Sequence, residues 1–207
     1  MRMTANPPQW AEALLRAFLN PDDFESVSGD LLEQYRDSIH AARGPLRANF
    51  WYLAQVCSFV SPGVGLFAAL FTAQFLVRTA LDWFQPPSNF FFRSTVSTAL
   101  GVGILLAAGF WAAWRSNSFA TGAIAGTLTA GIASIASIAG AAVMLAIWHD
   151  PRIMAAIRGS GGFEEVVSLP LMMVLPGALF GACGGVASAG LKRLLPVSNH
   201  PNNNPEK

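Results

Sequence analysis

Charged residues are scarce in this sequence, and their absence is concentrated in long stretches. Only 12% of its 207 residues are Asp, Glu, Lys or Arg. None of these charges falls in residues 48–77, 94–114, 116–149 or 166–191. A membrane-spanning helix needs about 20 apolar residues to cross about 30 Å of hydrocarbon, so each stretch is long enough. The pattern excludes an ordinary soluble domain and predicts an integral membrane protein.

Other scarcities narrow the range of functions. The two cysteines, Cys57 and Cys183, lie in separate apolar stretches and form no CxxC or Cys/His cluster, which disfavours a zinc site or a disulfide framework. A net charge of +1 gives no basic surface for nucleic acid. The centres of the expected spans hold no ionisable residue, which disfavours a proton relay, and no histidine, which disfavours haem. We therefore expect no cofactor, no nucleic-acid partner and no catalytic site.

The fold that these stretches predict is all-α, an integral membrane four-helix bundle of residues 63–195 with a small N-terminal helical head. Pro170 and Pro176 predict kinks in the last span. The tail, residues 196–207, is rich in Asn and Pro and is predicted to be disordered. The four spans are expected at about 63–83, 94–114, 120–148 and 165–191.

The head, residues 1–47, has apolar residues at helical spacing. A first helix is expected to end at Asn20-Pro21, and a second to run from Asp22 to a stop at Gly44. The apolar face expected on the first helix comprises Trp10, Leu14, Leu15 and Phe18.

The pattern of apolar and aromatic residues in 48–62 predicts a separate amphipathic helix at the membrane surface. Aromatic residues begin it, and Ser61-Pro62-Gly63 is expected to break or kink the chain before the first span. The face expected to contact lipid comprises Phe50, Leu53, Val56 and Val60.

The distribution of Lys and Arg predicts the orientation. Four spans place both termini on one side, which carries nine basic residues against four on the other. Because cytoplasmic loops are enriched in Lys and Arg, we expect the head and tail to be cytoplasmic, in an inner (plasma) membrane. The N-terminus lacks a signal-peptide pattern, so the first span is expected to direct its own insertion.

Small residues recur every four positions in the last two spans. Gly177, Gly181 and Gly185 form one stripe, and Gly122 and Gly126 begin another. Such stripes let helix backbones approach closely in lipid. They predict helix packing, either inside one bundle or with a second copy or another membrane protein, and the sequence leaves these alternatives open.

A weak metal-site hypothesis concerns His149, Asp150, Glu164 and Glu165, which flank one loop. Histidine and carboxylates suit several divalent metals. Helix capping explains the same residues better, because Asp150 precedes a short helix and the two glutamates begin a span, where the helix dipole favours negative charge. A membrane-surface enzyme built on His149 is weaker still.

The head also resembles a known domain. Gly29-Asp30-Leu31, followed by Glu33, Tyr35-Arg36 and the pair Trp51-Tyr52, resembles the permease prefix domain of bacterial permeases of the macrolide-exporter and cell-division type. The resemblance covers residues 7–62 and ends there, since those permeases have a large extracytoplasmic domain where this chain has a loop of about ten residues. It implies a bacterial inner-membrane protein with a cytoplasmic helical head, and it transfers no catalytic residue.

The sequence leaves two functional hypotheses open. Asp30, Glu33 and Arg36 are expected to share a helix face that docks a partner. The leading hypothesis is a non-enzymatic membrane protein that acts through interaction or assembly, with the bilayer and another membrane protein or a second copy as partners. The alternative is a small transporter or permease component whose third and fourth spans line the path.

Overall fold

All regular structure that is described in this chain is helical. The structure is a computed structural model, and it describes residues 6–85, 90–148, 151, 154–155 and 162–194. Within these ranges there is no strand, which confirms the all-α fold. The helices are α1 (Gln9–Phe18), α2 (Pro21–Gln34), the π-helix η1 (Tyr35–His40), α3 (Ala41–Phe84), α4 (Phe90–Ser116), α5 (Phe119–Ile147), α7 (Gly162–Met172) and α8 (Val174–Leu194).

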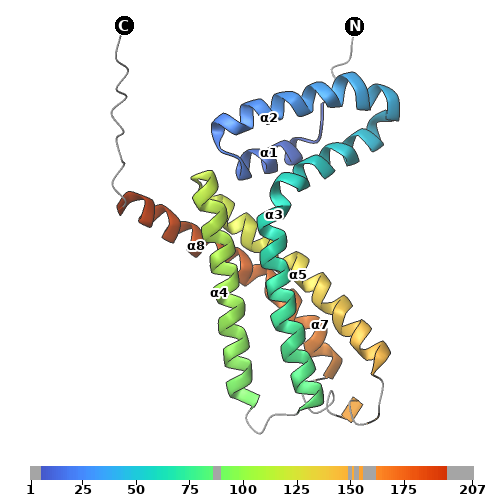
Figure 1. Cartoon of the computed structure of the whole chain (residues 1–207), viewed down its shortest axis with the longest axis vertical. Helices are drawn as coiled ribbons and strands as arrows, with labels where there is room; N and C mark the ends of the chain where they lie inside the picture. The colour runs from blue at the N-terminus through green and yellow to red at the C-terminus, as the bar shows by residue number, and fades with distance from the viewer. Residues whose placement is uncertain (1–5, 86–89, 149–150, 152–153, 156–161, 195–207) are drawn as a thin grey trace, which may run out of the picture.

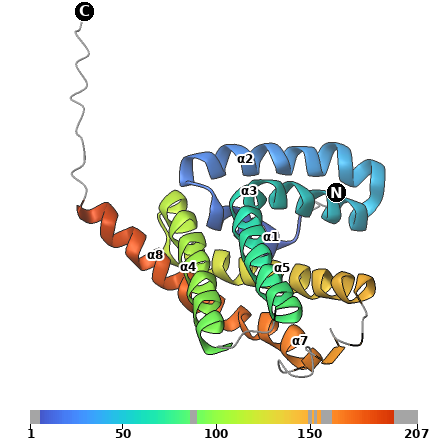
Figure 2. The same cartoon turned by 60° about the horizontal axis from the view of Figure 1, so that its bottom comes forward.

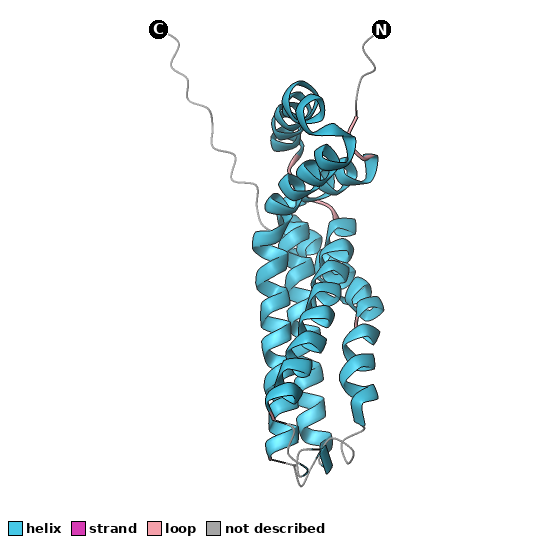
Figure 3. Ribbon diagram, turned by 90° about the vertical axis from the view of Figure 1, so that its right-hand side faces the viewer, coloured by secondary structure: helices cyan, strands magenta, loops and turns pink. Residues whose placement is uncertain are grey.

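Four of these helices are long and apolar enough to cross a membrane. They lie lengthwise beside one another, and the head formed by α1, α2 and the start of α3 lies at one end of the bundle (Figures 1 and 3). This arrangement is that of a helical bundle with four candidate membrane spans, as a multi-pass membrane protein requires. The membrane-spanning portions are Pro62–Phe84, Phe91–Ser116, Phe119–Ile147 and Val174–Leu194.

The predicted last span, 165–191, is two helices and not one. The chain turns at Met173, where its N–H donates to the Pro170 carbonyl at 3.2 Å. Pro176 has no N–H with which to continue the ladder across this point. The Ser134 hydroxyl of α5 donates to the same Pro170 carbonyl. A side chain from a neighbouring span thus helps to satisfy a backbone group at the break, as lipid requires.

Of the break or kink predicted at residues 61–63, the break is wrong, because α3 continues through Pro62. The helix changes direction between its head portion and its membrane portion, which accounts for the proline without a break (Figure 1). The true stop is Gly44, as predicted. Its φ of 74° is non-helical, and it separates η1 and the first turn of α3 from the rest of the helix.

The core of the head joins the prefix helices to α3. Ala11 and Leu15 of α1 pack with Tyr35, Tyr52 and Val56. The predicted faces are therefore partly wrong. Trp10 is 60% exposed and Phe50 is 72% exposed, because the buried faces are Ala11, Leu15 and Phe18 on α1 and Ala48, Tyr52, Val56 and Val60 on α3. Residues 48–62 thus pack against α1, where the sequence had suggested a helix lying on lipid.

Tyr35 is the polar centre of this core. Its hydroxyl donates to Asn49 Oδ1 at 2.7 Å, and its ring meets the Tyr52 ring edge-on with centroids 5.9 Å apart. Burial raises the pKa of the Tyr35 phenol above its ordinary value, and burial followed by the nearby Glu12 carboxylate does the same for Tyr52. Both phenols therefore stay neutral at physiological pH.

The head is packed onto the end of the bundle. Phe18 of α1 is buried with Val60 and Val64 of α3, Ala112 of α4 and Ala125 of α5. A hydrogen bond of 2.7 Å from Thr121 Oγ1 to the Ala17 carbonyl fixes the contact between α1 and α5. Figure 2 shows α1 between α2 and the membrane helices. The head and the membrane domain therefore form one packed body.

The C-terminal end of α8 lies at the same end of the bundle as the head. Lys192 donates to the Trp114 carbonyl and to Asn117 Oδ1, in the turn between α4 and α5. The other end of the bundle holds the last turn of α3 and the start of α4 (Figure 1). The head, the α4–α5 turn and the end of α8 thus share one side.

Gly44→Ala is expected to destabilise the head by about 1–2 kcal/mol, because an L-residue is strained at positive φ. A Cβ at Gly44 meets nothing within 4 Å, so the cost is conformational only. Gly29→Ala in the middle of α2 is the matched control, since its Cβ also meets nothing within 4 Å. Alanine there should stabilise by about 0.5–1 kcal/mol. Thermal unfolding in detergent, followed by circular dichroism, measures both, and equal shifts would contradict the assignment.

Candidate functional site

The glycine stripes meet face to face where α5 and α8 cross. A Cβ built on Gly126 would lie 2.1 Å from the Gly177 carbonyl oxygen and 2.9 Å from the Gly181 Cα. One on Gly122 would lie 2.6 Å from the Gly181 carbonyl oxygen. These distances leave no space for any side chain, so the two backbones are in direct contact. The two stripes therefore contact each other within one chain.

A third helix takes part in this contact, which the stripes did not predict. Gly109 of α4 would place a Cβ 2.1 Å from the Gly181 carbonyl oxygen, and Gly184 would place one 2.1 Å from the Leu106 carbonyl oxygen. Helix α8 is therefore wedged between α4 and α5. Gly109 belongs to no four-residue glycine repeat and shares its span with Gly101 and Gly103, so the sequence did not single it out. We call Gly109, Gly122, Gly126, Gly177, Gly181 and Gly184 the glycine seam.

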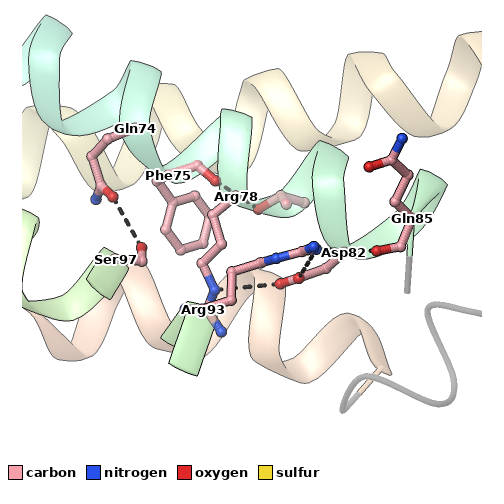
Figure 4. Close-up of polar contacts among 8 residues, drawn as sticks. Gln74, Phe75, Arg78, Asp82, Gln85, Arg93 and Ser97 are labelled. Atoms are coloured by element: carbon pink, nitrogen blue, oxygen red, sulfur yellow. Dashed lines mark hydrogen bonds and ion pairs between the residues drawn. The ribbon is translucent and has the colours of Figure 1, made fainter. Parts of the chain in front are cut away.

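A buried ion-pair cluster joins α3 to α4 at the end of the bundle remote from the head (Figure 4). Asp82 is 7% exposed and lies 2.9 Å from Arg93 Nη1 and 3.4 Å from Arg78 Nε. Arg93 also donates to the Gln85 carbonyl at 3.1 Å. The cluster of Arg78, Asp82 and Arg93 was not predicted from the sequence. Arg93 was missed as their partner, although a basic residue opening the next helix is the signal.

A polar pair and an apolar groove lie beside this cluster. Ser97 donates to Gln74 Oε1 at 2.9 Å, linking α3 to α4 one to two turns deeper in the membrane portion (Figure 4). A groove of about 760 Å³ runs between the same helices, lined mainly by Leu, Val and Phe side chains. The Ser97 hydroxyl and the Gln74 side-chain oxygen are thus paired with each other. Leu70, Val77 and Leu100 of the groove are exposed. The cluster therefore ties two spans together and contains no nucleophile–base arrangement.

The outer surface of the head carries an acidic hollow. Asp30, Glu33, Gln34 and Asp37 line a shallow depression of about 350 Å³, and all four residues are exposed. Arg36, the third residue of the predicted docking face, does not line this hollow and donates to Asn6 Oδ1 at 2.7 Å. Arg36 and Asp37 lie in the π-helix η1, which has more residues per turn than an α-helix. Asp37, four residues after Glu33, takes the place that Arg36 was expected to fill.

The weak metal candidates cannot be placed as a site. His149 and Asp150 lie outside the described residues, and only the backbone of Glu164 and Glu165 is described, in α7. Among the residues that the structure describes, no group of three or more His, Cys, Asp or Glu residues is close enough to hold a metal ion. Cys57 and Cys183 are free and exposed on the helices.

These features define the chain as an all-α protein with four candidate membrane-spanning helices, a head packed on one end and an ion-pair cluster at the other. Comparisons of the sequence with protein-family models and with curated proteins, and of the structure with solved structures, gave no significant match. The class therefore rests on the fold alone.

Gly126→Ala is expected to destabilise the bundle by about 1–3 kcal/mol, the usual cost of overpacking, because its Cβ meets a backbone oxygen that cannot rotate away. Gly131→Ala is the matched control in the same helix, since a Cβ there meets nothing within 4 Å. The loss of helical signal on heating in detergent measures both variants. A midpoint for Gly126→Ala equal to that of Gly131→Ala would contradict the seam.

Asp82→Asn is expected to cost about 3–5 kcal/mol, because it leaves two arginines side by side without their buried counter-ion. Asp37→Asn, on the exposed surface of the head, should change stability by less than about 0.5 kcal/mol. Urea unfolding in mild detergent compares the two. If Asp82→Asn were as stable as wild type, the cluster would not hold α3 to α4.

Proposed function

We propose that this protein is a non-enzymatic membrane anchor that acts through protein interaction, with the head as its docking module. The observation that carries the proposal is the acidic hollow of Asp30, Glu33 and Asp37 on the side of the head that is exposed. Its three carboxylates lie on consecutive helical turns and favour a partner with a basic surface. The proposed docking surface is this hollow.

The packing of the head supports this proposal. A head attached by a flexible linker would orient its surface at random, whereas Phe18 and the Thr121–Ala17 hydrogen bond hold α1 against three spans. The hollow is therefore held at a fixed position relative to the membrane. A partner bound there would be recruited to the membrane in one orientation. Because α1 contacts α3, α4 and α5, a force on the head would be transmitted to these three helices.

The location we propose is a bacterial inner membrane with the head in the cytoplasm. The excess of Lys and Arg on the head side supports this orientation. The likeness of residues 7–62 to the permease prefix domain supports the same side and the bacterial origin.

The transporter alternative receives less support from the packing. A path lined by the third and fourth spans would run between α5 and α8, where Gly126 and Gly177 bring backbone against backbone. Opening it would require separating this contact. The interaction hypothesis needs no such motion, so it remains the proposal.

The test is photo-crosslinking from the hollow in intact cells that make the protein. A photoreactive amino acid replaces Gln34, which lines the hollow without contributing charge. We expect a discrete protein adduct that Asp30→Lys abolishes and that weakens at high salt, since exposed charge contacts are screened. Glu25→Lys makes the same charge reversal elsewhere on α2 and should keep the adduct.

Two results would contradict the proposal. An adduct that survives Asp30→Lys unchanged would show that the hollow does not select the partner. The absence of any protein adduct at Gln34, with Glu25→Lys and wild type folded and inserted, would remove the docking role of the head.

A further inference from the structure

A second polar cavity lies at the head end of the bundle, between α8 and the α4–α5 turn. Its volume is about 230 Å³, and Asn117, Ser118 and Phe119 line it together with Ser188 and the basic pair Lys192 and Arg193. Both charged residues in its lining are cations, and no carboxylate lines it among the described residues. The cavity therefore carries a charge of one sign only.

The contacts that Lys192 makes with the described residues are all neutral. Its ammonium donates to the Trp114 carbonyl and to Asn117 Oδ1, and it lies 5.0 Å from the centroid of the Trp114 ring. These groups orient the ammonium, yet none of them supplies a negative charge. A cation held in place by neutral groups beside a cavity favours an anion as the missing counter-ion.

Two polar features of the cavity point to the same chemistry. Helix α5 begins there, its cap residue Ser118 makes no side-chain capping hydrogen bond, and its first turn has no acidic residue. The first backbone N–H groups of a helix form a ready site for phosphate. Ser188 is 1% exposed, and its hydroxyl is buried without a hydrogen-bond partner among the described residues. A phosphate oxygen would provide the acceptor that this hydroxyl lacks.

The cavity lies where the spans end, which decides the source of the anion. Helix α4 ends at Ser116, the span of α5 begins at Phe119, and α8 ends at Leu194. Phe119 is 64% exposed and Trp114 is 36% exposed, and aromatic side chains gather at the lipid–water boundary. We propose that this cavity binds the phosphate of an anionic phospholipid in the leaflet on the side of the head.

Native mass spectrometry of the full chain, titrated with phosphatidylglycerol and with phosphatidylcholine, tests the proposal. Each of the two basic residues that line the cavity is expected to contribute about a fivefold preference for an anionic lipid held there. We therefore expect wild type to prefer phosphatidylglycerol by up to about 30-fold and Lys192→Gln/Arg193→Gln to lose most of that preference. Arg115→Gln, which removes a cation on the same side but outside the cavity, should keep the preference.

Two further variants separate binding from folding. Lys192→Arg keeps the charge and should keep the preference. Ser188→Ala removes the unpaired hydroxyl and should weaken phosphatidylglycerol binding about fivefold, the value of one hydrogen bond. Circular dichroism in phosphatidylcholine checks that each variant retains the helical content of wild type.

Three outcomes would overturn the proposal. Equal binding of the two lipids by wild type would show that the cavity selects no anionic lipid. Full preference in a folded Lys192→Gln/Arg193→Gln variant would place the selectivity elsewhere. Displacement of phosphatidylglycerol by millimolar inorganic phosphate would identify a soluble anion as the ligand.

Discussion

The direct contact between the backbones of α4, α5 and α8 is the constraint on which the rest of the structure depends. Lipid tails are as apolar as the side chains of the spans, so helices in a bilayer gain little from hydrophobic burial against one another. Close backbone approach provides dispersion contacts in its place. Gly181 lies against both Gly109 and Gly122, so one residue fixes three helices. The bundle then has a defined end on which the head packs.

This constraint links the end of α8 to the head. Because α8 is wedged between α4 and α5, its last turn brings Lys192 to the α4–α5 turn, and the start of α5 lies under Ala17 of the head. The proposed lipid cavity and the docking hollow thus lie on one side of the membrane, joined through α5 and α1. A lipid bound at Lys192 would stabilise the same α5 terminus against which the head is packed. Protein docking and lipid binding are therefore expected to favour each other.

The spans and the stop at Gly44 could be predicted from the sequence because their signals are local. Charge-free length defines a span, and glycine tolerates the positive φ that ends a helix. Pro62 and Pro170 show the limit of local signals, since one is accommodated within α3 and the other contributes to a break beside Ser134. The exposure of Trp10 and the ion pair of Arg93 with Asp82 depend on which helices become neighbours. Contacts between helices leave no periodic pattern in the sequence of either helix.

The most direct test of the seam is solid-state nuclear magnetic resonance on protein in lipid, with its 19 glycines labelled at Cα. The account predicts cross-peaks from Gly126 to Gly181, because the built Cβ of one lies 2.9 Å from the Cα of the other. It also predicts that these cross-peaks keep their relative intensity when labelled chains are diluted with unlabelled ones. Cross-peaks that vanish on dilution would show that the stripes join separate copies, and their complete absence would contradict the wedged position of α8.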